Sequence, residues 1–289
     1  MTGVRTPGAF PCYCAGPASG RMLGVTYLLD DAVATTPAGP GHHLVQMSAQ
    51  WNTANQTPNG GYILALLLQA VLAESRHPDA LTLAVTYFRP SLPGPAEITV
   101  RELRSGRRVS SYDAVLRQGE KEVAHAVIST HDWNAVSGRT HTPHAAPDAP
   151  PPEKCLDLGE QFPVGLVPIL DRYDYRAPTV PGWLEGKPSG ITEGLCWIRS
   201  KDQRPLDTLL AGAMVDAFPP VIVELGTMAS ATIQLTVHFR ARPATDTSWA
   251  LGHVVTRHLI DGYHDETVEL WGTDGRLIAQ SHQLAILTE

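Results

Sequence analysis

The chain has 289 residues, enough for two domains of ordinary size, each with its own core. Hydrophobic residues make up 43% and charged residues 18%, which is typical of a soluble globular protein. The net charge of −7 argues against a nucleic-acid partner, because phosphate binding requires a basic surface. No apolar run approaches the ~20 residues needed to cross a bilayer, so no membrane partner is expected.

The first 21 residues are rich in Gly, Pro and Ala and contain no unbroken apolar stretch like that of a signal peptide. We expect residues 1–21 to be a disordered leader, with Met22 as a candidate start of the functional chain. The cysteines show neither the paired spacing of a zinc site nor that of a disulfide framework; they are Cys12, Cys14, Cys155 and Cys196. Reduced thiols in a cytoplasmic protein are the expected state, with no metal and no cofactor.

The first half, residues 22–133, contains one helix candidate among strand candidates. The apolar stretch Gly60–Ser75 has the length of a helix. Runs rich in β-branched and aromatic residues, separated by turn residues, predict strands. These strands are His43–Trp51, Leu81–Phe88, Ala96–Arg104, Val109–Gln118 and Glu122–His131.

Residues 134–152 contain five prolines, one glycine and few large apolar residues, so they are predicted to be a linker. The second half, residues 153–289, then repeats the earlier order. Its helix candidate is Leu206–Phe218, stopped by Pro219 and Pro220. Its predicted strands are Gly194–Ser200, Ser230–Arg240, Trp249–Arg257, Ile260–Trp271 and Leu277–Leu287.

Local sequences also match between the halves. Val85–Arg89 (VTYFR) matches Thr236–Arg240 (TVHFR), and Val123-Ala124 matches Ile278-Ala279 at nearly the same offset. An internal duplication is the simplest interpretation. Because both helices are apolar on nearly every side, each should be buried, with an antiparallel sheet wrapped around it. We therefore expect an α+β fold, two sheets joined edge to edge through unpaired edge strands.

Asp216 is the most informative polar residue, because it follows a run of apolar helix residues. A carboxylate in such surroundings is costly unless it is hydrogen-bonded, and burial changes its pKa. The C-terminal end of a helix is also electrostatically unfavourable for an acid. The alternative interpretations are a solvent-facing Asp at a helix end and an Asp that bonds a nearby backbone group. The first helix carries only Gln69 and Glu74 as polar side chains in the matching stretch, so one site, with its acid in the second half, is expected.

Thr232 and Gln283 are, taken alone, ordinary polar residues of two predicted strands. Strand alternation places Thr232 on the same face as Gln234, Thr236 and His238, opposite the apolar residues between them. No GxSxG, GxxxxGK[ST] or GxGxxG motif occurs, so serine-hydrolase and nucleotide-binding sites are unsupported.

Several signatures together resemble the acyl-CoA thioesterase II type of double-hotdog protein. In the first half they are Trp51 and Pro58–Tyr62 (PNGGY). In the second half they are Asp216, Thr232–Arg240 (TIQLTVHFR) and Asp274–Ala279 (DGRLIA), which leads into Gln283. The family motif usually has an Asp two residues after the Thr, where this chain has Gln234.

The resemblance implies a hotdog fold in each half and hydrolysis of an acyl thioester, with acyl-CoA or another pantetheine thioester as partner. It implies that Asp216, Thr232 and Gln283 position a hydrolytic water. It also implies that the helix start of the first half, at Gly61 and Tyr62, binds the substrate oxygen. A homo-oligomer formed through the sheet edges is a further expectation.

Three alternatives stay open. The chain could be a non-catalytic acyl-binding double hotdog, or a thioesterase for carrier-protein thioesters, which present the same pantetheine arm. A hotdog hydratase or dehydratase is less favoured. That chemistry usually requires an Asp/His pair near a helix start, and neither predicted helix contains a histidine.

Overall fold

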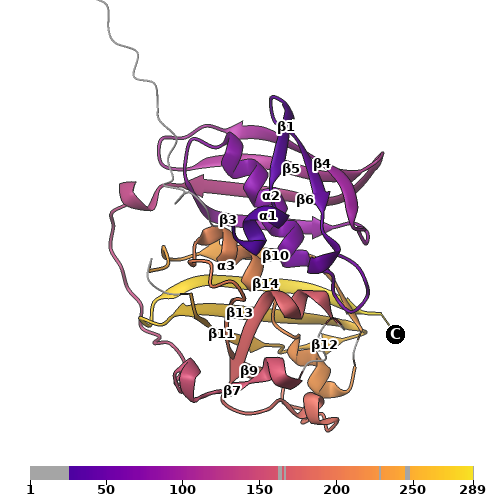
Figure 1. Cartoon of the computed structure of the whole chain (residues 1–289). Helices are drawn as coiled ribbons and strands as arrows, with labels where there is room; N and C mark the ends of the chain where they lie inside the picture. Colours follow the sequence, from indigo (N-terminus) through magenta and orange to yellow (C-terminus); the bar gives the residue numbers. More distant parts are fainter. Residues whose placement is uncertain (1–25, 162–164, 166, 228, 245–247, 289) are drawn as a thin grey trace, which may run out of the picture.

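The computed structural model describes residues 26–161, 165, 167–227, 229–244 and 248–288 (Figure 1). The expected leader, residues 1–21, and Met22 lie outside these ranges. The first half contains α1 (Leu28–Ala32), β1 (Thr35–Gly39), β2 (His42–Met47), α2 (Gly60–Glu74), β3 (Asp79–Tyr87), β4 (Gly94–Arg104), β5 (Ser110–Gln118) and β6 (Lys121–His131). The second half contains β7 (Leu156–Asp157), β8 (Tyr173–Ala177), β9 (Glu193–Ser200), α3 (Thr208–Met214), β10 (Ser230–Phe239), β11 (Ala250–Val255), β12 (Leu259–Ile260), β13 (Tyr263–Gly272) and β14 (Leu277–Leu287).

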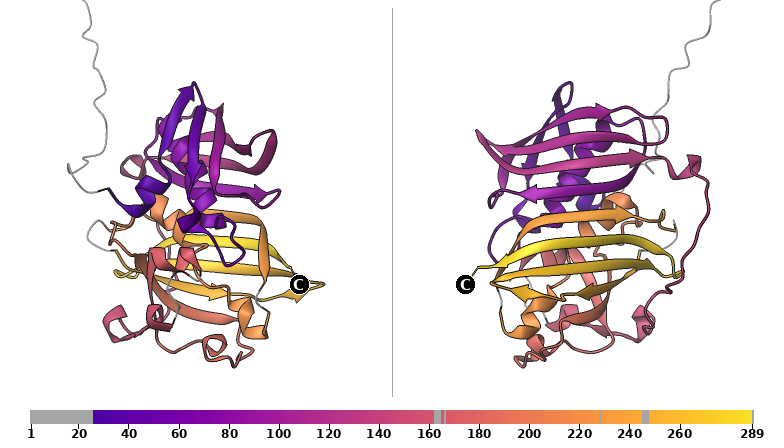
Figure 2. Two further views of the ribbon diagram at one scale, coloured as in Figure 1. Left: turned by 45° about the vertical axis from the view of Figure 1, so that its right-hand side comes forward. Right: turned by 180° about the vertical axis from the view of Figure 1, so that it is seen from behind.

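All these strands belong to one 14-stranded antiparallel sheet, ordered β1-β2-β4-β5-β6-β3-β10-β14-β13-β11-β9-β8-β7, with β12 paired to β13. The order β2-β4-β5-β6-β3 in the first half returns reversed as β10-β14-β13-β11-β9 in the second. The halves join where β3 pairs with β10, from Thr86 opposite Gln234 to Thr82 opposite His238. The view from behind shows this continuous sheet (Figure 2). The expected α+β architecture with edge-to-edge joining is confirmed.

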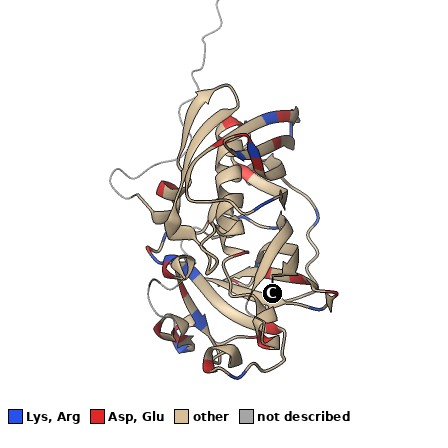
Figure 3. Cartoon of the chain, turned by 90° about the vertical axis from the view of Figure 1, so that its right-hand side faces the viewer, with Lys and Arg blue, Asp and Glu red and all other residues tan. Residues whose placement is uncertain are grey.

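Helix α2 is buried along most of its length, and it contacts strands β3 to β6 on one side and α3 on the other. It begins at Gly60 because the Asn59 side chain caps it: Asn59 Oδ1 accepts a hydrogen bond from Tyr62 N–H at 3.1 Å. Charged residues lie on strands and loops (Figure 3), whereas α3 contains none and α2 contains only Glu74, at its end. The sheet therefore encloses an apolar interior at the junction of the halves.

Helix α3 is shorter than predicted. It ends at Met214 instead of Phe218, so Asp216 lies beyond the helix and not in its last turn. Pro219 and Pro220 provide no N–H groups for the carbonyls of the next turn. Other side chains bond to these carbonyls instead: Asn59 Nδ2 donates to the Asp216 carbonyl at 2.8 Å, and the Tyr175 hydroxyl donates to the Ala217 carbonyl at 2.7 Å.

Two predicted strands also differ. The run His43–Trp51 is a strand only to Met47 and then turns into a short 3-10 helix, Ala49–Trp51. The run Ile260–Trp271 is interrupted at Asp261, which adopts a left-handed backbone (φ +50°), so β12 and β13 form a hairpin. Strands β1, β7 and β8 lie in segments where the sequence pattern predicted none.

The predicted linker has no helix or strand between Val136 and Pro151, and it runs down one side of the molecule (Figure 1). It is nevertheless docked onto the second half, because the Trp197 indole N–H donates to the Pro150 carbonyl at 2.8 Å. None of the described helices is long and apolar enough to cross a membrane.

Close packing of α2 on α3 predicts that Gly61→Ala destabilises the protein. A Cβ atom at Gly61 would lie 2.5 Å from the Ala213 carbonyl oxygen, so the two helices must separate. We expect the free energy of unfolding to fall by about 1–3 kcal/mol, as for other overpacked sites. A Gly→Ala change within a helix ordinarily has the opposite sign, about 0.5–1 kcal/mol stabilising.

Urea unfolding followed by circular dichroism measures this change. The control is Gly138→Ala in the linker, where an added Cβ meets no atom within 4 Å. An unchanged or higher stability of the Gly61 variant would show that the helices tolerate greater separation.

Candidate active site

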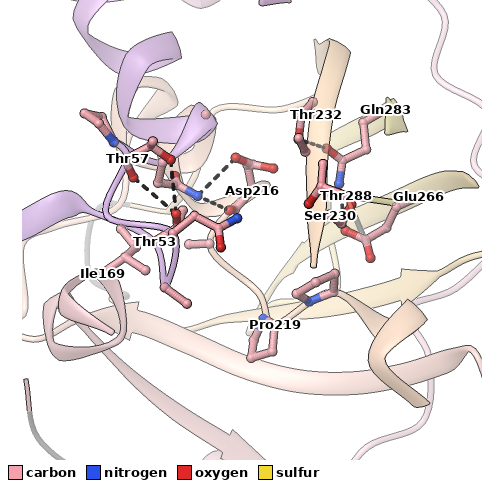
Figure 4. A pocket seen from close by; sticks show the side chains of 18 of the residues that line it. Thr53, Thr57, Ile169, Asp216, Pro219, Ser230, Thr232, Glu266, Gln283 and Thr288 are labelled. Carbon is pink, nitrogen blue, oxygen red and sulfur yellow. Dashed lines mark hydrogen bonds between the residues drawn. The ribbon is translucent and has the colours of Figure 1, made fainter. Parts of the chain in front are cut away.

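A cavity of about 710 Å³ lies at the junction of the two halves. Its wall combines the start of α2, the end of β3, the segment after α3, and the facing parts of β10, β13 and β14. All three residues expected to be catalytic, Asp216, Thr232 and Gln283, line this one cavity. Asp216 lies on one wall, and Thr232 and Gln283 lie together on the other (Figure 4).

Asp216 is held by the first turn of α2, which belongs to the other half. Its Oδ2 accepts hydrogen bonds from Gly61 N–H at 2.7 Å and from Asn59 Nδ2 at 3.1 Å. A helix N-terminus carries unpaired N–H groups and a partial positive charge, both of which favour a carboxylate. The acid is therefore at the unfavourable end of its own helix and at the favourable end of another.

Two glycines allow this close approach. A Cβ at Gly60 would lie 2.8 Å from Asp216 Oδ2, and a Cβ at Gly61 would lie 3.0 Å from Asp216 Cβ. Any side chain at either position would push the carboxylate away from the helix. Steric crowding by Asp216 thus explains why both positions are glycine in this fold.

Burial raises the pKa of Asp216 to about 6, because the charged form loses hydration inside the protein. Hydrogen bonds from Gly61, Asn59 and Gly60 stabilise the charged form and limit the rise. A carboxyl group with a pKa near the working pH is suited to accept and release a proton.

Thr232 and Gln283 form a hydrogen-bonded pair, with Thr232 Oγ1 donating to Gln283 Oε1 at 2.9 Å. Their strands, β10 and β14, are direct neighbours in the sheet. The chain of hydrogen bonds continues, because Gln283 Nε2 donates to Glu266 Oε1 at 2.9 Å. Glu266 Oε2 in turn accepts from Val221 N–H at 3.1 Å.

The side of the strand on which Thr232 lies differs from the prediction. Leu235, Val237 and Phe239 are buried, so strict alternation would place Thr232 on the outer face with Gln234. The pairing of β10 with β14 shifts register between Thr232 and Gln234. This bulge inserts one extra residue and turns Thr232 into the cavity.

Glu266 was not identified from the sequence. It is 3% exposed on β13 and lies directly opposite Gln283 in the register. Alternation counted back from buried Val268 and Leu270 places Glu266 on the inner face, and that signal could have found it. Burial, together with the negative charge of Asp216, raises the pKa of Glu266 to about 8.

Gly61 and Tyr62 are not placed as expected for substrate donors. Gly61 N–H is bonded to Asp216 and Tyr62 N–H to Asn59, so neither donor is free. Gly60 and Ile63 of this turn line the cavity, whereas Gly61 and Tyr62 do not. Tyr62 is fully buried, and its hydroxyl donates to the Ala32 carbonyl at 2.9 Å. The physical reason is that the Asn59 cap and the Asp216 carboxylate satisfy the helix end internally.

One histidine also lines the cavity. His264 on β13 is bonded through Nε2 to the Ser230 hydroxyl at 2.7 Å. Burial lowers the pKa of the His264 ring, which favours its neutral form. Among the residues that the structure describes, no group of His, Cys, Asp and Glu side chains is arranged to hold a metal ion.

Both halves of the chain are similar to known protein domains. The family model for the acyl-CoA thioesterase N-terminal domain matches residues 47–131, and the model for the C-terminal domain matches residues 143–287. An uncharacterised protein of Mycobacterium tuberculosis is 26% identical over 267 residues, which cover 84% of this chain and 89% of that protein.

Two solved structures are similar over nearly the whole chain. A hotdog-fold protein of unknown function from Alicyclobacillus acidocaldarius has a TM-score of 0.82 and 26% identity, covering 92% of this chain and 99% of that one. A candidate thioesterase II from Thermobifida fusca has a TM-score of 0.79 and 26% identity, covering 91% and 98%. The chain belongs to the acyl-CoA thioesterase family, carries the two domains of that family in order, and has a hotdog fold.

Proposed function

We propose that this chain hydrolyses acyl-CoA thioesters by water attack, with Asp216 as the general base. The observation that carries the proposal is the cavity itself. It places a carboxyl group with a pKa near 6 opposite the hydrogen-bonded pair of Thr232 and Gln283. Family membership supports thioester hydrolysis in general, and the acyl-CoA substrate and the residue roles are our inference.

In the proposed mechanism, one water molecule is held between the two walls of the cavity. The Thr232 hydroxyl donates its hydrogen to Gln283, so its lone pairs are left to accept one hydrogen from water. Ionised Asp216 accepts the other hydrogen. The water oxygen then attacks the thioester carbonyl, the C–S bond breaks, and the proton taken up by Asp216 passes to the departing thiolate. Gly61 supports this step indirectly, by holding the carboxylate.

The shape and lining of the cavity suit an acyl group on a pantetheine arm. Most of the wall is apolar, which favours a hydrocarbon chain; examples are Ile63, Phe88, Ile169, Leu184 and Ile286. Arg89 also lines the cavity and is exposed, so it offers a positive charge to a phosphate group at the entrance.

A panel of acyl-CoAs with a thiol-detecting reagent tests the proposed activity. Thiol release with at least one chain length supports hydrolysis, whereas calorimetric binding without release supports the acyl-binding alternative. A carrier-protein thioester with the same acyl group compares the two pantetheine donors by kcat/KM. An enoyl-CoA, followed by loss of its conjugated absorbance, tests for hydratase chemistry, to which His264 would be relevant.

Asp216→Asn is expected to lower kcat by about 10²–10⁴-fold, because the amide cannot accept the proton of water. Steady-state hydrolysis of the best acyl-CoA measures the effect, and circular dichroism monitors folding. The matched control is Asp79→Asn, a buried aspartate outside the cavity that is bonded to Trp133 N–H and Arg242. Similar kinetic losses in both variants would mean that Asp216 has only a structural role.

The pH dependence of kcat/KM is expected to follow the ionisation of Asp216. The base must be unprotonated, so activity should be low below pH 6 and rise as the pH passes through about 6. Initial rates between pH 4.5 and pH 8 measure the profile. The residual activity of Asp216→Asn should lack this rise, and a profile identical to that of the parent chain would contradict the assignment.

Thr232→Val is expected to lower kcat by about 10–100-fold, because it removes the hydroxyl that would hold the water but keeps the β-branched shape. The control is Thr236→Val on the same strand, between buried Leu235 and Val237 and away from the cavity wall. Equal kcat values for the two variants would remove Thr232 from the mechanism.

A further inference from the structure

Glu266 is a buried acid whose two carboxyl oxygens both face hydrogen-bond donors. Oε1 accepts from the Gln283 side chain and Oε2 accepts from Val221 N–H. Burying a carboxyl group is costly, and an apolar side chain would fill an inner-face position of β13 without that cost. The specific contribution of Glu266 is therefore the acceptor that it presents to Gln283.

This acceptor determines which way the Gln283 amide points. An amide group has an accepting oxygen at one end and a donating NH₂ at the other. With ionised Glu266 on one side, the NH₂ must face Glu266, so the oxygen faces Thr232. A flipped amide would bring its oxygen against the carboxyl oxygen of Glu266 and its NH₂ against the Thr232 hydroxyl.

The orientation of Gln283 in turn fixes the hydrogen of Thr232. Because Gln283 offers only an acceptor, the Thr232 hydroxyl donates to it and its lone pairs point elsewhere. The orienting effect belongs to the ionised form, because the carboxylate offers only acceptors, whereas the neutral carboxyl group has one O–H that could donate to a flipped Gln283 amide. Burial raises the pKa of Glu266 to about 8, so both forms occur near neutral pH.

We propose that Glu266 is a positioning residue: through Gln283 it orients the Thr232 hydroxyl so that the oxygen lone pairs face the cavity opposite Asp216. The proposal rests on the proposed hydrolytic function, since it explains how the water-holding pair is kept in one arrangement. Glu266 itself lines the cavity, and the role proposed for it is exerted through its hydrogen bond to Gln283.

Glu266→Gln tests the proposal with minimal change of shape. A glutamine has one accepting and one donating end, whereas this position faces two donors. With its oxygen toward Gln283, the new amide sets its NH₂ against Val221 N–H; with its NH₂ toward Gln283, the Gln283 amide must flip to accept. These two arrangements compete, so Gln283 loses its fixed orientation. We expect kcat to fall by about 10–100-fold with KM within about twofold, because the change misplaces a group that acts after binding.

A double-mutant cycle separates positioning from general damage. In a Gln283→Ala background there is no amide to orient, so Glu266→Gln should change kcat by less than about twofold. If Glu266→Gln lowers kcat equally in both backgrounds, Glu266 does not act through Gln283 and the proposal is overturned.

Hydrogen exchange of the Gln283 side-chain amide gives a test that needs no activity. The amide ¹⁵N–H signals are assigned by their loss in Gln283→Ala, and they should exchange faster in Glu266→Gln than in the parent chain. The control is Glu224→Gln, a buried glutamate that accepts hydrogen bonds from Ser189 and Trp183 N–H and lies outside the cavity lining. That variant should leave Gln283 exchange unchanged.

The two failures are distinguishable. If the parent chain releases no thiol from any thioester, the proposed function is wrong, and the exchange measurement still decides whether Glu266 orients Gln283. If the parent chain is active and Glu266→Gln changes neither kcat nor amide exchange, the positioning proposal alone is wrong.

Discussion

The cavity depends on one contact between the halves, the carboxylate of Asp216 against the first turn of α2. The second half supplies the acid, and the first half supplies the N–H groups and the two glycines that make room for it. Burial disfavours the charge while the helix end favours it, and burial is the larger effect, leaving a pKa of about 6. Neither half by itself provides both effects on the pKa of Asp216.

The sheet makes that contact possible because it fixes where the halves lie. Pairing of β3 with β10 joins the two sheets without a gap, and α2 and α3 then pack against each other inside it. The polar wall opposite Asp216 comes from three neighbouring strands, with Thr232, Gln283 and Glu266 each one strand apart. The register of the strands thus determines which side chains form the hydrogen-bonded chain. The packing of the two helices determines where the Asp216 carboxylate lies.

The sequence was sufficient for the order of the two central helices and the long strands around them, because apolar helices and β-branched strands have distinct periodicities. It also led to Asp216, an acid among apolar residues. It did not predict α1, β1, β7 or β8. It did not reveal the bulge beside Thr232, since one extra residue in a strand depends on the pairing partner. Nor did it show that Gly61 N–H would be taken by Asp216, because that bond joins residues of different halves. Strand alternation counted from Val268 could have predicted that Glu266 faces inward. Its role could not be predicted, because it depends on Gln283 in the neighbouring strand.

The fusion of the halves has a consequence for how such a protein can change. Two identical subunits related by symmetry must accept every substitution twice, once in each copy of a pocket. When both copies of the fold lie in one polypeptide, the acid can be kept in one half and the glycine turn in the other. Substitutions can then improve each half independently. The continuous sheet keeps the partners matched while their sequences drift apart.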